Sequence, residues 1–282
     1  MNMFDNLART LAVTLTAVVC LLLCWPATAA AAGPGSSVSA YDGSLSKALQ
    51  AIGTQEATLV IDTPATVDGD TTTPATLGLV FRKGGRINVG DHTVRINGPI
   101  EAGPYTIFEG TGQVTIADNA VAHLYVEWWG GSADGTTDNT PAFAAAMSAM
   151  SNPTIQLLQG TYLGVVAAAN KTVTLKDSGK WKTTIKNNVP TAHTISLRGS
   201  PAGTMISDLK VDMNGAEETG ILLVRCNYAD VERIGIVGQG GTGKYALHLS
   251  NCTLSSFKDV MFGDRNEGHL AVAAARRPIS AD

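Results

Sequence analysis

Apolar and polar residues alternate over short runs in the carboxy-terminal half of the chain. The runs lie within three segments: "TISLRGSPAGTMISDLKVDMNG" (194–215), "GILLVRCNYADVERIGIVGQG" (220–240) and "YALHLSNCTLSSFKDVMFGD" (245–264). This alternation is the period of a β-strand with one buried face. No segment carries a helical period long enough for a hairpin of helices. Each segment therefore predicts two short strands joined by turns, and residues 238–244 are a candidate for a third.

The three segments repeat at a nearly constant spacing. Three apolar series recur every 25 or 26 residues: Leu197, Leu223 and Leu249; Leu209, Ile234 and Val260; and Val211, Ile236 and Phe262. A fixed period of this length indicates stacked units, because one such unit cannot bury its own apolar face. Equivalent strands would then pair in parallel, about 4.8 Å apart. We predict an all-β chain folded as a parallel β-helix. A flat sandwich of hairpins is the alternative, although it requires no equal spacing.

One segment in the middle of the chain departs from the strand pattern. "VEWWGGSADGTTDNTPAFAAAM" (126–147) is rich first in Gly, Asp and Thr and then in Ala. Asp134 and Asp138 are predicted to stabilise a turn by accepting hydrogen bonds from nearby amides. A short helix should follow, with Thr140 as its N-cap and Pro141 in its first position. Its apolar face comprises Phe143, Ala146, Met147 and Met150. We expect this helix to cover the open end of the stack.

The amino terminus has the pattern of a secretion signal. An uncharged apolar stretch (10–24) is followed by small residues up to Ala32. We predict that residues 1–32 are a signal peptide and that the protein is secreted, periplasmic or at the cell surface. A retained anchor is the alternative, but the stretch is shorter than the ~20 residues that span a bilayer. We therefore expect no stable membrane span after removal of the signal.

Charge and cysteine content narrow the picture further. Charged residues make up 16% of the chain and the formal net charge is −4, so no basic stripe suggests a nucleic-acid partner. Cys20 and Cys24 would leave with the signal. Cys226 and Cys252 are 26 residues apart and should lie on neighbouring units. They are predicted either as a buried pair of thiols or as a disulfide, since neighbouring strands lie within bonding reach.

The chain resembles the pectate-lyase-like superfamily domain over residues 127–264. Four segments carry the resemblance, in order: "WWGGSADGTTDNTPAFAAAM" (128–147), "IQLLQGTYLG" (155–164), "TVTLKDSGKWKTTIKNN" (172–188) and "ISDLKVDMNGAEETGILL" (206–223). In that family, a Gly- and Asp-rich turn after a Trp opens a capping helix, and a strand pair around a Gly-x-Tyr begins the solenoid. The resemblance implies a right-handed parallel β-helix with an amino-terminal capping helix, preceded by a β-rich leader.

The resemblance also implies binding or breakdown of a uronate-containing polysaccharide by a lyase, a hydrolase or an epimerase. Hydrolysis needs two carboxylates about 5–9.5 Å apart, whereas elimination needs a cation and a base. Our catalytic candidates are Asp212 and Asp230. Our candidates for substrate binding are Trp128, Trp129 and Arg225. The resemblance adds Ca²⁺ as a candidate cofactor, although the residues themselves predict no metal site, because the histidines lack ligand spacing.

Alternatives exist for most of these residues. Asp212 lies in "VDMNG", which also reads as a turn after a strand, and the two tryptophans also suit packing beside the helix. Further outward-facing candidates are Asp208, Asp259 and Asp264, with Arg198 and Arg233 as further candidate bases. A non-catalytic structural or adhesive module, of the kind found in phage tailspikes, is the alternative function.

Four regions follow from these observations. They are the signal peptide (1–32), the β-rich leader (33–125), the pectate-lyase-like domain (126–264) and an irregular tail (265–282). The repeat breaks down after Asp264, so we expect a truncated form of a longer relative. The partner implied by the resemblance is a polysaccharide, and the implied assembly is a homotrimer.

Overall fold

The computed structural model describes residues 36–177, 179, 181–201, 203–239 and 245–263, together with the backbone of residues 270–273 and 280–281. All of them belong to one unit, Pro34–Asp282. The predicted signal peptide lies outside the described residues, with Cys20 and Cys24, and so do Asp264 and most of the predicted tail. No helix in the described part of the chain is long and apolar enough to cross a membrane.

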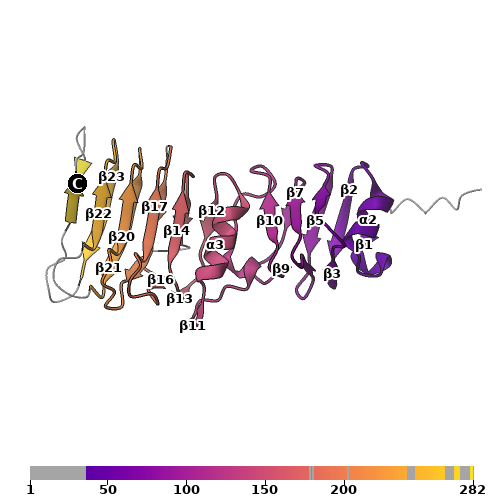
Figure 1. Ribbon diagram of the computed structural model, residues 1–282, viewed down its shortest axis with the longest axis horizontal. Helices are drawn as coiled ribbons and strands as arrows, with labels where there is room; N and C mark the ends of the chain where they lie inside the picture. The colour runs from indigo at the N-terminus through magenta and orange to yellow at the C-terminus, as the bar shows by residue number, and fades with distance from the viewer. Residues whose placement is uncertain are drawn as a thin grey trace, which may run out of the picture. The chain divides into compact units, whose positions relative to one another are not determined.

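Strands of the leader recur in groups of three. The groups are β2 (Ala57–Ile61), β3 (Pro64–Thr66) and β4 (Thr71–Thr73); β5 (Leu77–Phe81), β6 (Arg86–Asn88) and β7 (Thr93–Ile96); and β8 (Ile100–Glu101), β9 (Phe108–Glu109) and β10 (Gln113–Ile116). Equivalent strands pair in parallel. With β1 (Ser36–Ser37), they form the sheets β1-β2-β5-β8, β3-β6-β9 and β4-β7-β10 (Figure 1). This parallel pairing is what we expected of a leader that extends the stack.

The leader has its own shorter period, which the sequence analysis missed. Register partners are 20 residues apart at Ala57 and Leu77, and 23 apart at Thr71 and Val94. Alternate residues of each strand point inward, and this inner side is apolar and fully buried. Its members include Leu59, Ile61, Leu79, Ile87 and Ile96. Variation in the corner lengths between strands obscures the period in the sequence.

A second helix that we did not predict lies beside the first leader strands. α2 (Leu45–Ile52) buries Leu45, Ala48 and Ile52, and it contacts β3 and the 3-10 helix η1 (Val38–Tyr41). The Ser44 side chain caps it by accepting a hydrogen bond from the Lys47 backbone amide at 3.2 Å. Serine at the N-cap and apolar residues at helical spacing were the available signals.

The carboxy-terminal half continues with three strand positions per repeat. Its strands are β12 (Thr154–Gln156), β13 (Gly160–Leu163), β14 (Val166–Ala169), β15 (Thr174–Lys176), β16 (Thr183–Lys186), β17 (Ile195–Arg198), β18 (Met205–Ser207), β19 (Lys210–Asp212), β20 (Ile221–Val224), β21 (Asp230–Val237), β22 (Leu247–Ser250), β23 (Ser256–Phe262), β24 (Leu270–Ala273) and β25 (Ser280–Ala281). First and second strands share one sheet, in which β21 and β23 fill both positions. Third strands form the sheet β14-β17-β20-β22-β24.

The predicted stacking of equivalent residues is confirmed. Leu197 pairs with Leu223 and Leu223 with Leu249 in parallel register. The series Val211, Ile236 and Phe262 pairs in the same way. The strands that we compared are parallel, whereas a sandwich of hairpins would pair them antiparallel, so that alternative is wrong here.

The extra strand in each repeat arises from a bend rather than from the Gly-rich link. Residues 238 and 239 are not in a strand, and residues 240–244 lie outside the described part. Instead, the second predicted run divides at a residue in the left-handed region of backbone space. These bend residues recur one repeat apart: Trp181 (φ 61°), Asp208 (φ 66°), Arg233 (φ 54°) and Asp259 (φ 50°). The bend turns the chain from the first strand face to the second.

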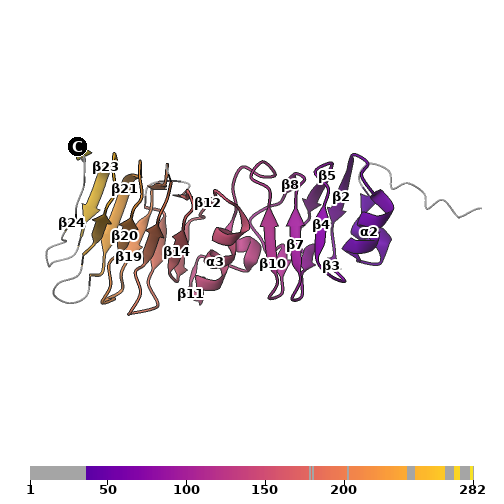
Figure 2. The ribbon, with the colours of Figure 1, turned by 45° about the horizontal axis from the view of Figure 1, so that its top comes forward.

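α3 (Thr140–Ala149) lies between the leader strands and the carboxy-terminal strands, as Figures 1 and 2 show. It contacts β10 on one side, β14 on the other, and the 3-10 helix η2 (Val126–Trp129). It therefore stands where a third strand would be. The predicted apolar face is buried throughout. The predicted helix is confirmed, and it covers strands on both sides instead of one open end.

The N-cap of α3 is Asn139, not Thr140 as predicted. The Thr140 amide donates to Asp138 Oδ1 at 3.0 Å, and the Thr140 hydroxyl accepts a hydrogen bond from the Val165 amide at 3.2 Å. Thr140 thus ties the helix to the chain next to β14, and it already has helical geometry. Pro141 consequently occupies the second helical position.

Candidate functional site

The structure places the catalytic candidates on different faces of the repeat. Asp212 is the last residue of β19, where it pairs with Lys186 on one side and Val237 on the other. Asp230 is the first residue of β21, and it pairs with Met205 and Ser256. The bend at Arg233 separates these two faces. The structure therefore does not bring the carboxylates of Asp212 and Asp230 together as a register pair.

Asp212 also takes part in the turn that follows β19. Its Oδ1 atom accepts a hydrogen bond from the Asn214 amide at 2.9 Å. A Cβ atom at Gly238 would lie only 2.3 Å from the same oxygen, so the next repeat needs glycine at this corner. One carboxylate oxygen is thus committed to the turn, as the alternative interpretation of "VDMNG" predicted.

Arg225 and the two tryptophans lie elsewhere. Arg225 is an exposed residue at the corner after β20, in left-handed geometry (φ 52°). Trp128 is 1% exposed, and its indole N–H donates to the Gly103 carbonyl at 2.9 Å. Trp129 is half-buried, with its ring centroid 5.4 Å from that of Phe108. Trp128 therefore has no open ring face for a sugar in this structure, as its alternative packing role would require.

The turn before α3 has the predicted structural role. Asp134 accepts hydrogen bonds at 2.8 Å from the amides of Thr136 and Thr137, and at 2.7 Å from the Thr137 hydroxyl. These bonds, led by that from the Thr137 amide, hold the pKa of Asp134 well below its usual range. The segment also forms β11 (Asp134–Asp138), which pairs with β13 in irregular register. Its carboxylates therefore stabilise the entry to α3.

Arg233 is held by two carboxylates at the bend. Its Nε atom lies 2.5 Å from Asp208 Oδ1, and its Nη2 atom lies 2.7 Å from both Asp208 Oδ2 and Glu232 Oε1. The hydrogen bond with Asp208, followed by that with Glu232, raises the pKa of Arg233 further. A base must give up its proton before it reacts, so these contacts oppose the predicted role of Arg233 as a base.

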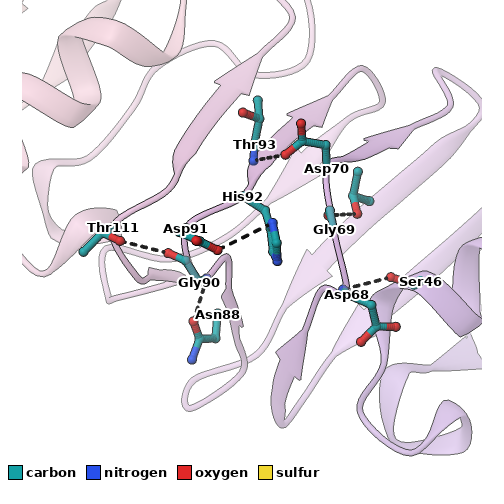
Figure 3. A network of polar contacts seen from close by, with 11 residues as sticks. Ser46, Asp68, Gly69, Asp70, Asn88, Gly90, Asp91, His92, Thr93 and Thr111 are labelled. Atoms are coloured by element: carbon teal, nitrogen blue, oxygen red, sulfur yellow. Dashed lines mark hydrogen bonds and ion pairs between the residues drawn. The ribbon is translucent and has the colours of Figure 1, made fainter.

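A second polar network lies at the leader corners, shown in Figure 3. Asp70 Oδ1 accepts a hydrogen bond from the Thr93 amide at 2.8 Å, Asn88 Oδ1 accepts one from the Gly90 amide at 2.9 Å, and His92 lies 3.6 Å from Asp91. These bonds join turns of neighbouring repeats. Within the described residues, no group of three or more His, Cys, Asp or Glu side chains is arranged to hold a metal ion.

A buried acidic pair that the sequence analysis missed lies beside α3. The Tyr162 hydroxyl donates to Glu127 Oε1 at 2.5 Å and accepts a hydrogen bond from the Leu158 amide at 3.0 Å. Glu127 is 7% exposed, and its Oε2 atom has no hydrogen-bond partner. Burial therefore raises the pKa of Glu127. No sequence signal separated this glutamate from a surface residue.

The best-formed candidate site is the outer side of the second strands, which we call the lysine face. It comprises Trp181, Thr184, Lys186, Lys210 and Asp212. Alternation along β16 and β19 turns the polar members outward, with Ile185 and Val211 buried between them. Lys186 pairs with Asp212 and Thr184 with Lys210, so these side chains are nearest neighbours across the sheet.

Trp181 completes the lysine face. Its side chain is 41% exposed, and a Cβ atom at Gly235 would lie 3.6 Å from its indole ring. The ring thus lies over Gly235, which is the register partner of Lys210. An exposed aromatic ring next to two ammonium groups and one carboxylate suits a hydroxylated, negatively charged ligand. The sequence analysis identified Asp212 but neither lysine nor Trp181, because the register that joins them was unknown.

Comparison with protein-family models, with curated proteins and with solved structures found no significant match.

Proposed function

We propose that this protein is an exported parallel β-helix protein of the pectate-lyase-like superfamily that binds an acidic polysaccharide on the lysine face. The parallel, in-register strands with three positions per repeat support the β-helix. The four sequence segments within residues 127–264 support the superfamily. The amino-terminal pattern supports export, and the homotrimer implied by the resemblance is checked by light scattering of the purified protein.

One observation carries the ligand class. Register places the ammonium groups of Lys186 and Lys210 on adjacent strands, beside an exposed indole. Ammonium groups bind carboxylates through charge-assisted hydrogen bonds, and an aromatic ring packs against the apolar side of a sugar. A polymer of uronate residues offers both features at regular intervals. A neutral glucan offers only the second.

Placement of the carboxylates favours binding over hydrolysis. Asp212 has lysine and valine as its register neighbours, and Asp230 lies across the bend. The paired-carboxylate geometry needed for glycoside hydrolysis is therefore not formed by these two residues. The non-catalytic alternative gains from this arrangement. Incubation with polygalacturonate, followed by assays for reducing ends and unsaturated product, separates a binding protein from a lyase or hydrolase.

The test compares binding of polygalacturonate and of a neutral glucan by calorimetry. We expect the wild-type protein to bind the acidic polymer, and the double variant K186A/K210A to bind it at least about tenfold more weakly, since each lost charged contact contributes roughly 1 kcal/mol. W181A should weaken it also. The matched control, K83A/K258A, changes the net charge equally at exposed lysines elsewhere. Equal binding by both double variants, or preference for the neutral glucan, would overturn the proposal.

A further inference from the structure

Two cysteines lie one above the other on neighbouring repeats. Cys226 and Cys252 each follow a third strand, two residues after the register partners Val224 and Ser250. Both are free thiols in this structure, with exposures of 0% and 2%. They are therefore buried neighbours in a core of otherwise apolar side chains.

The two thiols have matching surroundings. Cys226 Sγ donates to the Leu197 carbonyl at 3.3 Å, and Cys252 Sγ donates to the Leu223 carbonyl at 3.4 Å, one repeat further along. The side chains thus point the same way from adjacent parallel strands. Such strands lie about 4.8 Å apart, within the roughly 4.4–6.8 Å between Cα atoms that disulfides span. A bond needs rotation of the side chains but no separation of the strands.

We propose that Cys226 and Cys252 are a redox-active pair, which forms a disulfide between neighbouring repeats when a small disulfide such as oxidised glutathione accepts the electrons. The Cys252 thiolate attacks one sulfur of the oxidant, giving a mixed disulfide and one glutathione thiolate. Cys226 loses its proton to solvent and its thiolate attacks the Cys252 sulfur, which releases the second glutathione thiolate. The pair loses two electrons and two protons, and the oxidant is reduced to two thiols.

The contact between the two sulfurs favours this order of attack. A hydrogen bond from Cys226 lowers the pKa of the Cys252 thiol, and the same bond raises the pKa of the Cys226 thiol. Thiolates are the nucleophiles in disulfide exchange. Because both groups are buried, we expect exchange to require opening of these repeats, and hence to be fastest during refolding.

The test is a peptide map of the full chain after refolding with oxidised and reduced glutathione. Free thiols are alkylated, and the protein is then digested with trypsin without reduction. Cleavage after Arg225, Arg233, Lys244 and Lys258 places the cysteines in peptides 226–233 and 245–258. We expect these peptides to be joined by one disulfide. The map also distinguishes this bond from any involving Cys20 or Cys24.

Thermal unfolding gives a second measurement. A disulfide between repeats restricts the unfolded chain, so reduction should lower the Tm of the oxidised protein by about 5 °C or more. The variants C226A and C252A should show neither the joined peptide nor this response. Peptides that remain separately alkylated, or that carry only glutathione, in the refolded wild-type protein would overturn the proposal.

Discussion

At the scale of single residues, Asn139 shows how one buried amide organises the entry to α3. It accepts a hydrogen bond from the Ser132 amide at 2.7 Å. It also donates to the carbonyls of Ser132 at 3.0 Å, Thr137 at 2.8 Å and Leu163 at 3.2 Å. The side chain is fully buried. Asn139 therefore joins the turn, the helix start and β13 at one point.

Replacing Asn139 with alanine should destabilise the protein by at least about 2 kcal/mol, because several buried backbone groups lose their partner. Urea unfolding measures this free energy. The control is N119A, at an exposed asparagine, which should change it by less than about 0.5 kcal/mol. Equal effects of the two variants would contradict the role given to Asn139.

Glu127 should make stability depend on pH. Its pKa is raised by burial, so between the ordinary and the raised pKa the folded state binds more protons than the unfolded state. The free energy of unfolding should therefore fall as pH rises through that window. The variant E127Q should remove this contribution, as measured by urea unfolding from acidic to neutral pH. E101Q, at an exposed glutamate, should retain it. An unchanged slope in E127Q would refute the assignment.

At the scale of elements, the corners between strands share one backbone device. Residues at the corner after each third strand adopt left-handed geometry in successive repeats: Asn170 (φ 57°), Gly199 (φ 66°), Arg225 (φ 52°) and Asn251 (φ 54°). The corner amides of Asn170, Gly199 and Arg225 each donate to the residue before the next corner: Arg198, Val224 and Ser250. The ladder of hydrogen bonds thus continues around the bend, which offsets the cost of left-handed geometry in non-glycine residues.

Gly199→Ala tests this device. The new Cβ atom would lie 2.6 Å from the Asn170 Oδ1 atom, in a backbone geometry that disfavours side chains. We expect a loss of about 1–2 kcal/mol in the free energy of unfolding. Gly69→Ala is the matched control, since no atom lies within 4 Å of its Cβ position. A loss in the control as large as that in Gly199→Ala would mean that left-handed geometry is not the cause.

Elements with a regular period were predictable from the sequence, and those shaped by bends were not. The stacked leucines and the buried face of α3 followed directly from spacing. Strand boundaries did not, because a left-handed residue such as Arg233 divides a run without any glycine or proline to mark it. The same bend explains why Asp212 and Asp230, both outward-facing in the sequence pattern, lie on different faces.

At the scale of the whole molecule, contacts are mostly between neighbouring repeats. The pairs that form the lysine face and the two cysteines depend on this arrangement, since each joins residues about one repeat apart. The sequence analysis found the cysteine pair because its spacing matched the repeat. It missed Lys186 and Lys210 because the corner between β16 and β19 includes an extra strand position, β17, whose length could not be read from spacing alone.

α3 occupies the place of a third strand, so the third sheet of the leader and that of the carboxy-terminal half are separate in the described part of the chain. The two halves also keep different periods. A gene duplication that added one whole repeat after β14 would extend its own sheets and leave the leader pairing unaltered. The helix is thus a boundary across which either half could lengthen during evolution without shifting the other.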